Sequence, residues 1–295
     1  MLFSLSNAPS AFQRLMNEVF ADLLDMCVVI YLDDILIYSN SLEDHKGHVK
    51  EVLHRLHVNG LYASPSKCLF YKKKVEFLGF IPGPEGIQMD EEKVCTIKTW
   101  PTPCKVKDMQ AFLGFTNFYR RFIYNYSKKS VPLTHLTKKN TSWNCNKDCQ
   151  AVFDTLKEAF TSAPVLAHWD PEAPIMVETD ASDYALAAIL STHINGDIHP
   201  IAFHSHTFNT AELNYDIHDK ELLTVHEAFK KWQHYLEGTP LPVNMVTDHK
   251  NLTYFSGTKL LSQCQARWSE YLSQFNLTIR FRPGRLGTKP DALTR

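Results

Sequence analysis

The sequence lacks any uninterrupted apolar run near 18 residues, and it has no secretory pattern at its start. A transmembrane helix needs such a run, so the sequence predicts no membrane span. Its seven cysteines follow no regular spacing, which indicates reduced thiols and an intracellular setting rather than a disulfide framework. Cys145 and Cys149 have no second pair nearby at finger spacing, which argues against structural zinc.

An excess of charge of one sign is also lacking. The 295 residues carry a formal net charge of −1, so the total charge says nothing about nucleic acid. The distribution is more informative: residues 109–147 contain seven Lys or Arg and no Asp or Glu, and residues 275–295 contain five Arg or Lys and one Asp. Such blocks predict a local phosphate-binding surface, with solvated faces as the alternative for either block.

The length predicts about two domains, and the first half combines helices with a hairpin. Apolar residues at helical spacing follow Pro9. Two apolar runs, 27–32 and 35–38, flank Asp33-Asp34, which predicts a β-hairpin with the acids at its tip. Further helices are expected over 41–59, within 90–139 and over 148–160, and prolines at 164, 171 and 174 mark a linker.

The second half predicts the element order β-β-β-α-β-α-β-α. Its long helix carries an apolar stripe that includes Leu222, Phe229 and Trp232. The strands are expected at 175–179, 185–191, 198–204, 243–247 and 277–281, and the helices at 210–236, at 260–275 and after Pro290.

Four acids of this half stand out by their position. Asp180 and Asp248 end predicted strands, Glu221 lies in the long helix, and Asp291 begins the terminal helix. Each one alone is an ordinary surface charge or a helix cap. Together they can converge at one sheet edge, where a cluster of carboxylates is costly unless cations neutralise it. Two Mg²⁺ ions about 4 Å apart would do so, and would clamp the attacking water and the leaving oxygen of a phosphodiester.

The segments around these acids resemble a known set of motifs. Thr179-Asp180-Ala181-Ser182, Asp219-Lys220-Glu221-Leu222, Thr247-Asp248-His249 and Pro290-Asp291-Ala292-Leu293 are similar to the four RNase H motifs of Ty3/gypsy-class long-terminal-repeat retrotransposons. The resemblance covers residues 175–295. Many relatives carry a different small or polar residue at the position of Pro290, and the histidine that cellular RNases H have shortly before the last acid has no counterpart between His249 and Asp291. The resemblance implies that Asp180, Glu221, Asp248 and Asp291 are catalytic metal ligands, and that the cofactor is two Mg²⁺ ions, with Mn²⁺ as a substitute.

The first half resembles reverse transcriptases. Tyr31-Leu32-Asp33-Asp34 is similar to their Tyr-x-Asp-Asp signature, and residues 3–13 are similar to their Asn-Ala-Pro segment. Residues 77–79 resemble the primer-grip strand, and residues 100–133 resemble the thumb. This resemblance implies that Asp33 and Asp34 are catalytic and that Asp33 binds metal.

Six polar or basic residues are the expected nucleic-acid contacts. The aromatic-basic stretch at 118–122 is typical of a template-primer contact, although helix core remains an equal alternative for its aromatics. The expected contacts are Gln13, Arg120, Arg121, Arg280, Arg282 and Arg285.

One part of the reverse transcriptase pattern has no counterpart in this sequence. The family's third polymerase acid, with the fingers, would lie upstream of Met1, and relatives often carry an internal Met at this position. We therefore expect RNA-directed DNA polymerase activity in the complete parent enzyme and none from this chain by itself.

These patterns together predict an α+β chain. A partial palm is expected at 1–88, a thumb at 89–140, a connector helix and linker at 141–172, and an α/β RNase H-like domain with a mixed five-stranded sheet at 173–295. The expected function is metal-dependent endonucleolytic cleavage of RNA in RNA–DNA hybrids, which would be recognised by shape, backbone and 2′-hydroxyl.

The expected partners are an RNA–DNA hybrid, template-primer nucleic acid and the rest of a Pol polyprotein with its protease and integrase. The family resemblance implies a cytoplasmic particle or the nucleus as the setting, and the sequence leaves the oligomeric state open. The alternative function is that of a catalytically inactive nucleic-acid-binding relic, which need not have kept all four acids.

Overall fold

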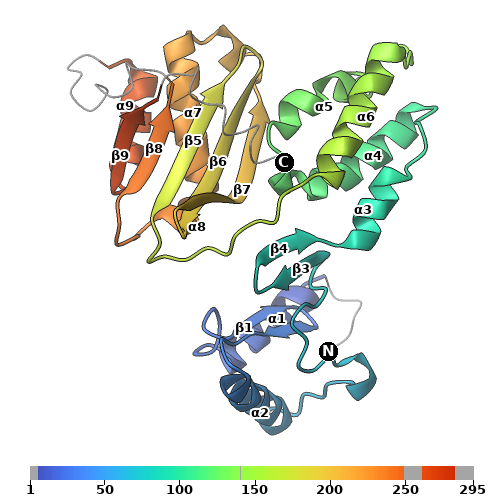
Figure 1. The fold of residues 1–295 in the computed structure, drawn as a ribbon, viewed down its shortest axis with the longest axis vertical. Helices are drawn as coiled ribbons and strands as arrows, with labels where there is room; N and C mark the ends of the chain where they lie inside the picture. Colours follow the sequence, from blue (N-terminus) through green and yellow to red (C-terminus); the bar gives the residue numbers. More distant parts are fainter. Residues whose placement is uncertain (1–5, 140, 249–260, 283–295) are drawn as a thin grey trace. The chain divides into compact units, whose positions relative to one another are not determined.

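The computed structural model describes residues 6–139, 141–248 and 261–282. The chain divides into two compact units, one ending at Pro84 and one beginning at Glu85 (Figure 1). The expected mixture of α and β structure is confirmed. In the described part of the chain, no helix is long and apolar enough to cross a bilayer.

The first unit is a small α+β layer built around a hairpin. Its core includes Phe20, Val28 and Val52, which are almost fully buried. Ser41 begins the second helix as its cap, because its hydroxyl accepts the Asp44 N–H at 3.1 Å. The elements are α1 (Ala8–Val19), β1 (Val28–Tyr31), β2 (Asp34–Ile37), α2 (Leu42–Val58), the short 3₁₀ helix η1 (Pro65–Lys67) and β3 (Phe80–Gly83).

The second unit begins with a strand and a group of helices. The rings of Phe112 and Phe153 lie 4.6 Å apart between two of these helices, and both are buried. Asn146 caps the last helix, since its side chain accepts the Cys149 N–H at 2.9 Å. The elements are β4 (Gly86–Met89), α3 (Glu91–Lys98), α4 (Val106–Phe118), η2 (Arg120–Phe122), α5 (Tyr126–His135) and α6 (Lys147–Thr161).

A five-stranded mixed sheet follows, which confirms the predicted sheet. Its strand order is β7-β6-β5-β8-β9, with antiparallel pairing among β5, β6 and β7 and parallel pairing from β5 through β8 to β9. The strands are β5 (Ile175–Ala181), β6 (Ala185–Ile194), β7 (Asp197–Thr207), β8 (Val243–Thr247) and β9 (Leu277–Phe281). Strands β8 and β9 have the predicted bounds, and the first three strands are longer than predicted.

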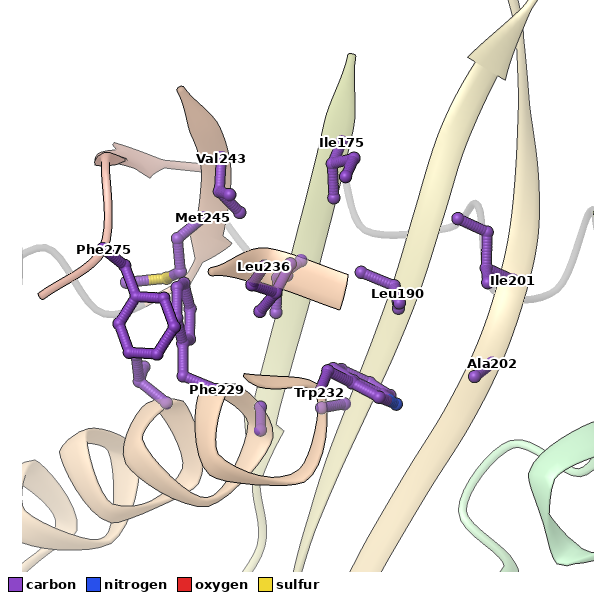
Figure 2. Close-up of a cluster of buried hydrophobic side chains, with 14 of the residues drawn as sticks. Ile175, Leu190, Ile201, Ala202, Phe229, Trp232, Leu236, Val243, Met245 and Phe275 are labelled. Carbon is purple, nitrogen blue, oxygen red and sulfur yellow. The ribbon is translucent and has the colours of Figure 1, made fainter. Parts of the chain in front are cut away.

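One face of this sheet packs against helices and forms the main core. Helix α7 (Ile217–Lys231) contributes Phe229, and Trp232 follows it directly. Figure 2 shows these rings between Leu190 and Ile201 on one side and Met245 on the other. Since side chains alternate along a strand, the residues between these core positions lie on the opposite face. That second face is where the acids of β5 and β8 are found.

The long helix predicted over 210–236 is wrong as a single element. The chain forms a 3₁₀ turn η3 (Glu212–Asn214), then α7, then a short helix α8 (Gln233–Leu236). The reason is local: the Asn209 side chain accepts the N–H groups of Ala211 and Glu212, which stabilises a separate turn before α7. The helix predicted over 260–275 is α9 (Gln263–Leu272). The predicted terminal helix lies outside the described residues.

Candidate active site

Two of the predicted acids lie side by side at the ends of parallel strands. Glu178 of β5 pairs with Val246 of β8, so two residues further along each strand Asp180 stands beside Asp248. Both are exposed at the same edge of the sheet. The surrounding protein atoms, which partly desolvate its carboxyl, and the nearby charge of Asp248 raise the pKa of Asp180. The sequence-based expectation that strand ends would bring these acids together agrees with this placement.

The third acid, Glu221, reaches the same edge from α7. Its side chain is buried, with 4% of the residue exposed, and its Oε1 accepts the Ala181 N–H at 3.3 Å. Its other oxygen, Oε2, is buried without a hydrogen-bond partner among the described residues. Burial, followed by the charges of Asp248 and Asp180, raises the pKa of Glu221 to about 8. The ionisation of Glu221 is therefore coupled to the charges of both strand-end acids.

This arrangement is suited to a divalent cation. A buried carboxylate oxygen without a partner is costly, and a cation would remove that cost. The donors are hard oxygens, which favour Mg²⁺ or Mn²⁺ over softer metals. Within the described ranges, no three His, Cys, Asp or Glu side chains already stand close enough to hold an ion together. The fourth predicted ligand, Asp291, lies outside the described residues.

A pocket of about 220 Å³ opens beside these acids on the second face of the sheet. Inside this pocket, the Glu178 carboxylate accepts a hydrogen bond from the Arg282 guanidinium. This ion pair joins β5 to the end of β9. Arg282 also donates its backbone N–H to Thr247 O at 2.9 Å. The pocket is lined by Tyr124, Glu178, Thr179, Asp180, Ala187, Ile189, Val246, Thr247, Asp248 and Arg282.

The predicted hairpin of the first unit is present, with Asp33 and Asp34 exposed at its tip. Tyr31 pairs with Asp34, and Leu32 in the turn has a φ of 50°, in the left-handed region. The Gln13 side chain holds this turn: its Oε1 accepts the Leu32 N–H at 2.7 Å, and its Nε2 donates to Ile30 O at 3.2 Å. Gln13 was expected to contact nucleic acid, and the structure places its amide against the hairpin backbone.

The predicted arginine contacts occupy different environments. Arg280 is exposed on β9, and Arg121 is half-buried in η2. Arg282 is paired with Glu178. Arg285 lies outside the described residues. The Arg120 guanidinium donates to Ser205 O and, at 3.0 Å, to Ser127 Oγ, and it lies over the Tyr126 ring. Arg120 therefore joins the helices to strand β7, and its contact with nucleic acid stays a prediction.

Replacing Arg120 should destabilise the second unit. Arg120→Ala removes a charged donor and leaves the Ser205 carbonyl without it, so we expect the free energy of unfolding to fall by about 2–3 kcal/mol. Urea denaturation measures this, with Lys138→Ala, which removes an exposed positive charge, as the control. An unchanged unfolding curve combined with weaker hybrid binding would instead support the original phosphate-contact expectation.

Three residues of this site were missed by the sequence analysis. Glu178 could have been found, because it lies two residues before Asp180 and therefore on the same face of the strand. Tyr124 lines the pocket. The positive charge of Lys128 acts to lower the pKa of Asp180, but desolvation and the charge of Asp248 raise that pKa by more. Tyr124 and Lys128 both come from the helical segment more than 50 positions earlier, and nothing in their local pattern points to the sheet.

Comparison with protein families matches both halves of the chain. Residues 3–81 match the family described as reverse transcriptase (RNA-dependent DNA polymerase). Residues 145–243 match the family described as an RNase H-like domain found in reverse transcriptase.

Curated relatives align with the whole chain. The Transposon Tf2-3 polyprotein of Schizosaccharomyces pombe is 36% identical over 298 residues, and the Tf2-7 polyprotein of the same organism is 35% identical. Each alignment covers 100% of this chain and 22% of the polyprotein. The chain thus spans about a fifth of the length of these relatives.

Solved structures share the fold. A foamy viral protease-reverse transcriptase in complex with RNA/DNA hybrid has a TM-score of 0.78 at 24% identity, over 96% of this chain and 39% of that one. The same kind of enzyme in complex with dsDNA has a TM-score of 0.79 at 24% identity, over 96% of this chain and 60% of that one.

Proposed function

The chain belongs to the reverse transcriptase and RNase H-like region of Ty3/gypsy-type retrotransposon polyproteins, and from this premise we propose that it cleaves the RNA strand of RNA–DNA hybrids. The residues that would act are Asp180, Glu221 and Asp248, with Asp291 as the fourth acid. A nucleic-acid enzyme is what both matched families imply. The finer assignment, hybrid-specific endonuclease, is our proposal.

One observation carries this proposal: the Glu221 side chain reaches the Ala181 N–H, directly after Asp180, and keeps a buried oxygen without a partner among the described residues, while the charges of Asp248 and Asp180 both act on it. The buried oxygen of Glu221 and its raised pKa are the signs of an acid cluster built for a positive ligand. A protein that needed only a stable fold would gain nothing from this arrangement, because each added acid raises the cost of ionising the others.

The four acids would hold two divalent cations. When bound there, these ions would supply the activation of water and the stabilisation of the leaving oxygen in phosphodiester hydrolysis. The protein's own part is orientation. Glu221 is fixed by α7 and by the Ala181 N–H, and Asp180 and Asp248 are fixed by the parallel pairing of β5 with β8. The Glu178–Arg282 ion pair stiffens the same face of the sheet.

The first unit has a different role in this proposal. Asp33 and Asp34 would serve nucleotidyl transfer in the longer polyprotein, with Gln13 holding the hairpin that displays them. The expected partners are therefore an RNA–DNA hybrid, a template-primer duplex and the remainder of the polyprotein. Two of the similar structures were solved with an RNA/DNA hybrid or with dsDNA, which supports this choice of partner.

Cleavage of a labelled hybrid by the purified chain tests the proposal. We expect cuts in the RNA strand with Mg²⁺ or Mn²⁺ and none with EDTA. Single-stranded and double-stranded RNA of the same sequence should remain intact, because the A-form-like hybrid is recognised by its shape. Tight hybrid binding without any cleavage would instead favour the alternative, a catalytically inactive nucleic-acid-binding relic. Neither the family matches nor the placement of the acids favours that alternative.

A further inference from the structure

Helix α2 carries two histidines near its start whose rings both contact one serine hydroxyl. Ser39 lies between β2 and α2, and its Oγ stands 2.7 Å from His48 Nδ1 and 3.3 Å from His45 Nδ1. His45 and His48 are three positions apart, which places them on the same face of the helix. Two imidazole nitrogens from α2 and one oxygen from the preceding segment therefore meet at one point of the first unit.

The surrounding structure holds this cluster in place. His45 and His48 are half-buried, and their contacts with Ser39 are partly shielded from solvent. The edge of one ring meets the face of the other between His45 and Tyr71, with the ring centroids 5.6 Å apart. The first turn of α2 is fixed by its Ser41 cap. Side chains held in this way lose little freedom when they bind a ligand.

Hydrogen bonding restricts the tautomers of the two rings. A serine hydroxyl has one hydrogen, so it can donate to the Nδ1 of one ring and must accept a hydrogen from the other. At least one of the two rings therefore carries its hydrogen on Nδ1 while these contacts last. A divalent cation removes this restriction. Both rings can then carry the hydrogen on Nε2 and offer the Nδ1 lone pair, which is a form in which neutral histidine binds metal.

From this geometry we propose that Ser39, His45 and His48 form a binding site for a divalent transition metal ion of the softness of Zn²⁺. The two Nδ1 atoms are its main ligands, the Ser39 hydroxyl is the third, and water completes the coordination. Zn–N bonds are about 2 Å long, shorter than either present contact, so both rings turn slightly toward the ion. Since one donor is a serine, the set differs from clusters of three His, Cys, Asp or Glu, of which the described ranges hold none.

The chemistry of the donors separates this site from the acids of the second unit. Imidazole nitrogens suit Zn²⁺, Ni²⁺ and Cu²⁺, whereas Mg²⁺ is bound through oxygen ligands. The inference therefore does not depend on hybrid cleavage or on the cations proposed for it.

A bound ion would link the acidic hairpin to the helix that follows it. Strand β2 begins at Asp34 and ends at Ile37, and Ser39 lies two positions further along the chain. His45 and His48 belong to the first two turns of α2. An ion with ligands on both sides of this junction holds the end of the hairpin strand against the helix. Its role is to stabilise the first unit, as a structural metal does.

The same helix provides a matched control. His54 and His57 are also three positions apart on α2, but both are exposed. If histidine spacing were sufficient, this second pair would bind metal as well as the first. If convergence on the Ser39 hydroxyl matters, the two pairs will differ.

The test compares two double variants of the full chain: His45→Gln with His48→Gln, and His54→Gln with His57→Gln. Zn²⁺ binding is measured by competition with a chromophoric chelator, in excess Mg²⁺ so that the carboxylates are already occupied. We expect the first double variant to bind one Zn²⁺ fewer per chain than the wild type, and the second to match the wild type. Ser39→Ala keeps both imidazoles and should weaken the site about tenfold, as expected when a group that orients metal ligands is lost.

A second measurement needs only the wild-type chain. Cu²⁺ with ascorbate oxidises the histidine rings that hold the copper ion, and mass spectrometry identifies the oxidised residues. His45 and His48 should be oxidised faster than His54 and His57. This measurement decides the question even if circular dichroism shows that the first double variant does not fold.

Two results would overturn the proposed site. One is the same Zn²⁺ stoichiometry in both double variants, and the other is equal oxidation of the two histidine pairs. Either result would leave the proposed hybrid cleavage untouched, because cleavage is assigned to acids of the second unit. Conversely, a wild type that binds this Zn²⁺ but does not cleave a hybrid would support the metal site and contradict the proposed function.

Discussion

Asp180→Asn should lower the rate of hybrid cleavage by at least about two orders of magnitude. The substitution keeps the shape of the side chain and removes one of the charges that would hold the cations. Because desolvation of its carboxyl and the charge of Asp248 already raise the pKa of Asp180, the neutral side chain should not destabilise the fold. A large loss of rate with an unchanged melting temperature would therefore identify Asp180 as part of the chemistry. Initial rates at saturating hybrid and Mg²⁺ measure the effect.

The matched control is Asp197→Asn, which removes an exposed charge from the first residue of β7. It changes the total charge of the protein by the same amount, and its rate should stay within about twofold of the wild type. Asp291→Asn extends the test to the fourth acid and should resemble Asp180→Asn. If Asp180→Asn cleaves as fast as the control, the site assignment is wrong.

The sequence predicted those elements whose causes are local. Strands β8 and β9 have the expected bounds because their alternating pattern matches one buried and one open face. The hairpin around Asp33 and Asp34 was predicted for a similar reason, since two apolar runs enclosed two acids. Where a side chain competes with the helix for backbone hydrogen bonds, the hydrophobic pattern did not predict the bounds of the element. Asn209 is an example, because its hydrogen bonds shorten the helix that periodicity predicted.

The site was predictable only in part, for a physical reason. Acids at strand ends converge by the geometry of parallel strands, so Asp180 and Asp248 could be placed together beforehand. Charge alone does not reveal what a side chain pairs with. Arg120 and Arg282 were both predicted to contact nucleic acid, and their charge does not show that Arg120 binds the backbone of β7 and Arg282 binds Glu178. Their partners lie 85 and 104 positions away in the chain, beyond the reach of any local pattern.

Glu221 should make the metal-free protein less stable as the pH rises. Its pKa is raised from 4.5 to about 8 in the folded state, first by burial and then by Asp248 and Asp180. Between these two pH values the folded protein holds a proton that the unfolded chain has released, so the free energy of unfolding falls as pH increases through this window. The full effect is about 5 kcal/mol, on the scale of about 1.4 kcal/mol for each unit of pKa. For the second unit of the chain, this loss of stability corresponds to a fall of roughly 10 °C in melting temperature.

The comparison of wild type with Glu221→Gln isolates this effect, because all other titrating groups are shared. In EDTA the two proteins should melt at similar temperatures at pH 5, and the variant should be the more stable one at pH 8, since its amide never needs to ionise. Adding Mg²⁺ at pH 8 should stabilise the wild type, because a bound cation replaces the proton, and should stabilise the variant much less. The same variant should lose hybrid cleavage. A difference in melting temperature that stays constant from pH 5 to pH 8 would show that the Glu221 carboxyl ionises normally and is not held in an acid cluster.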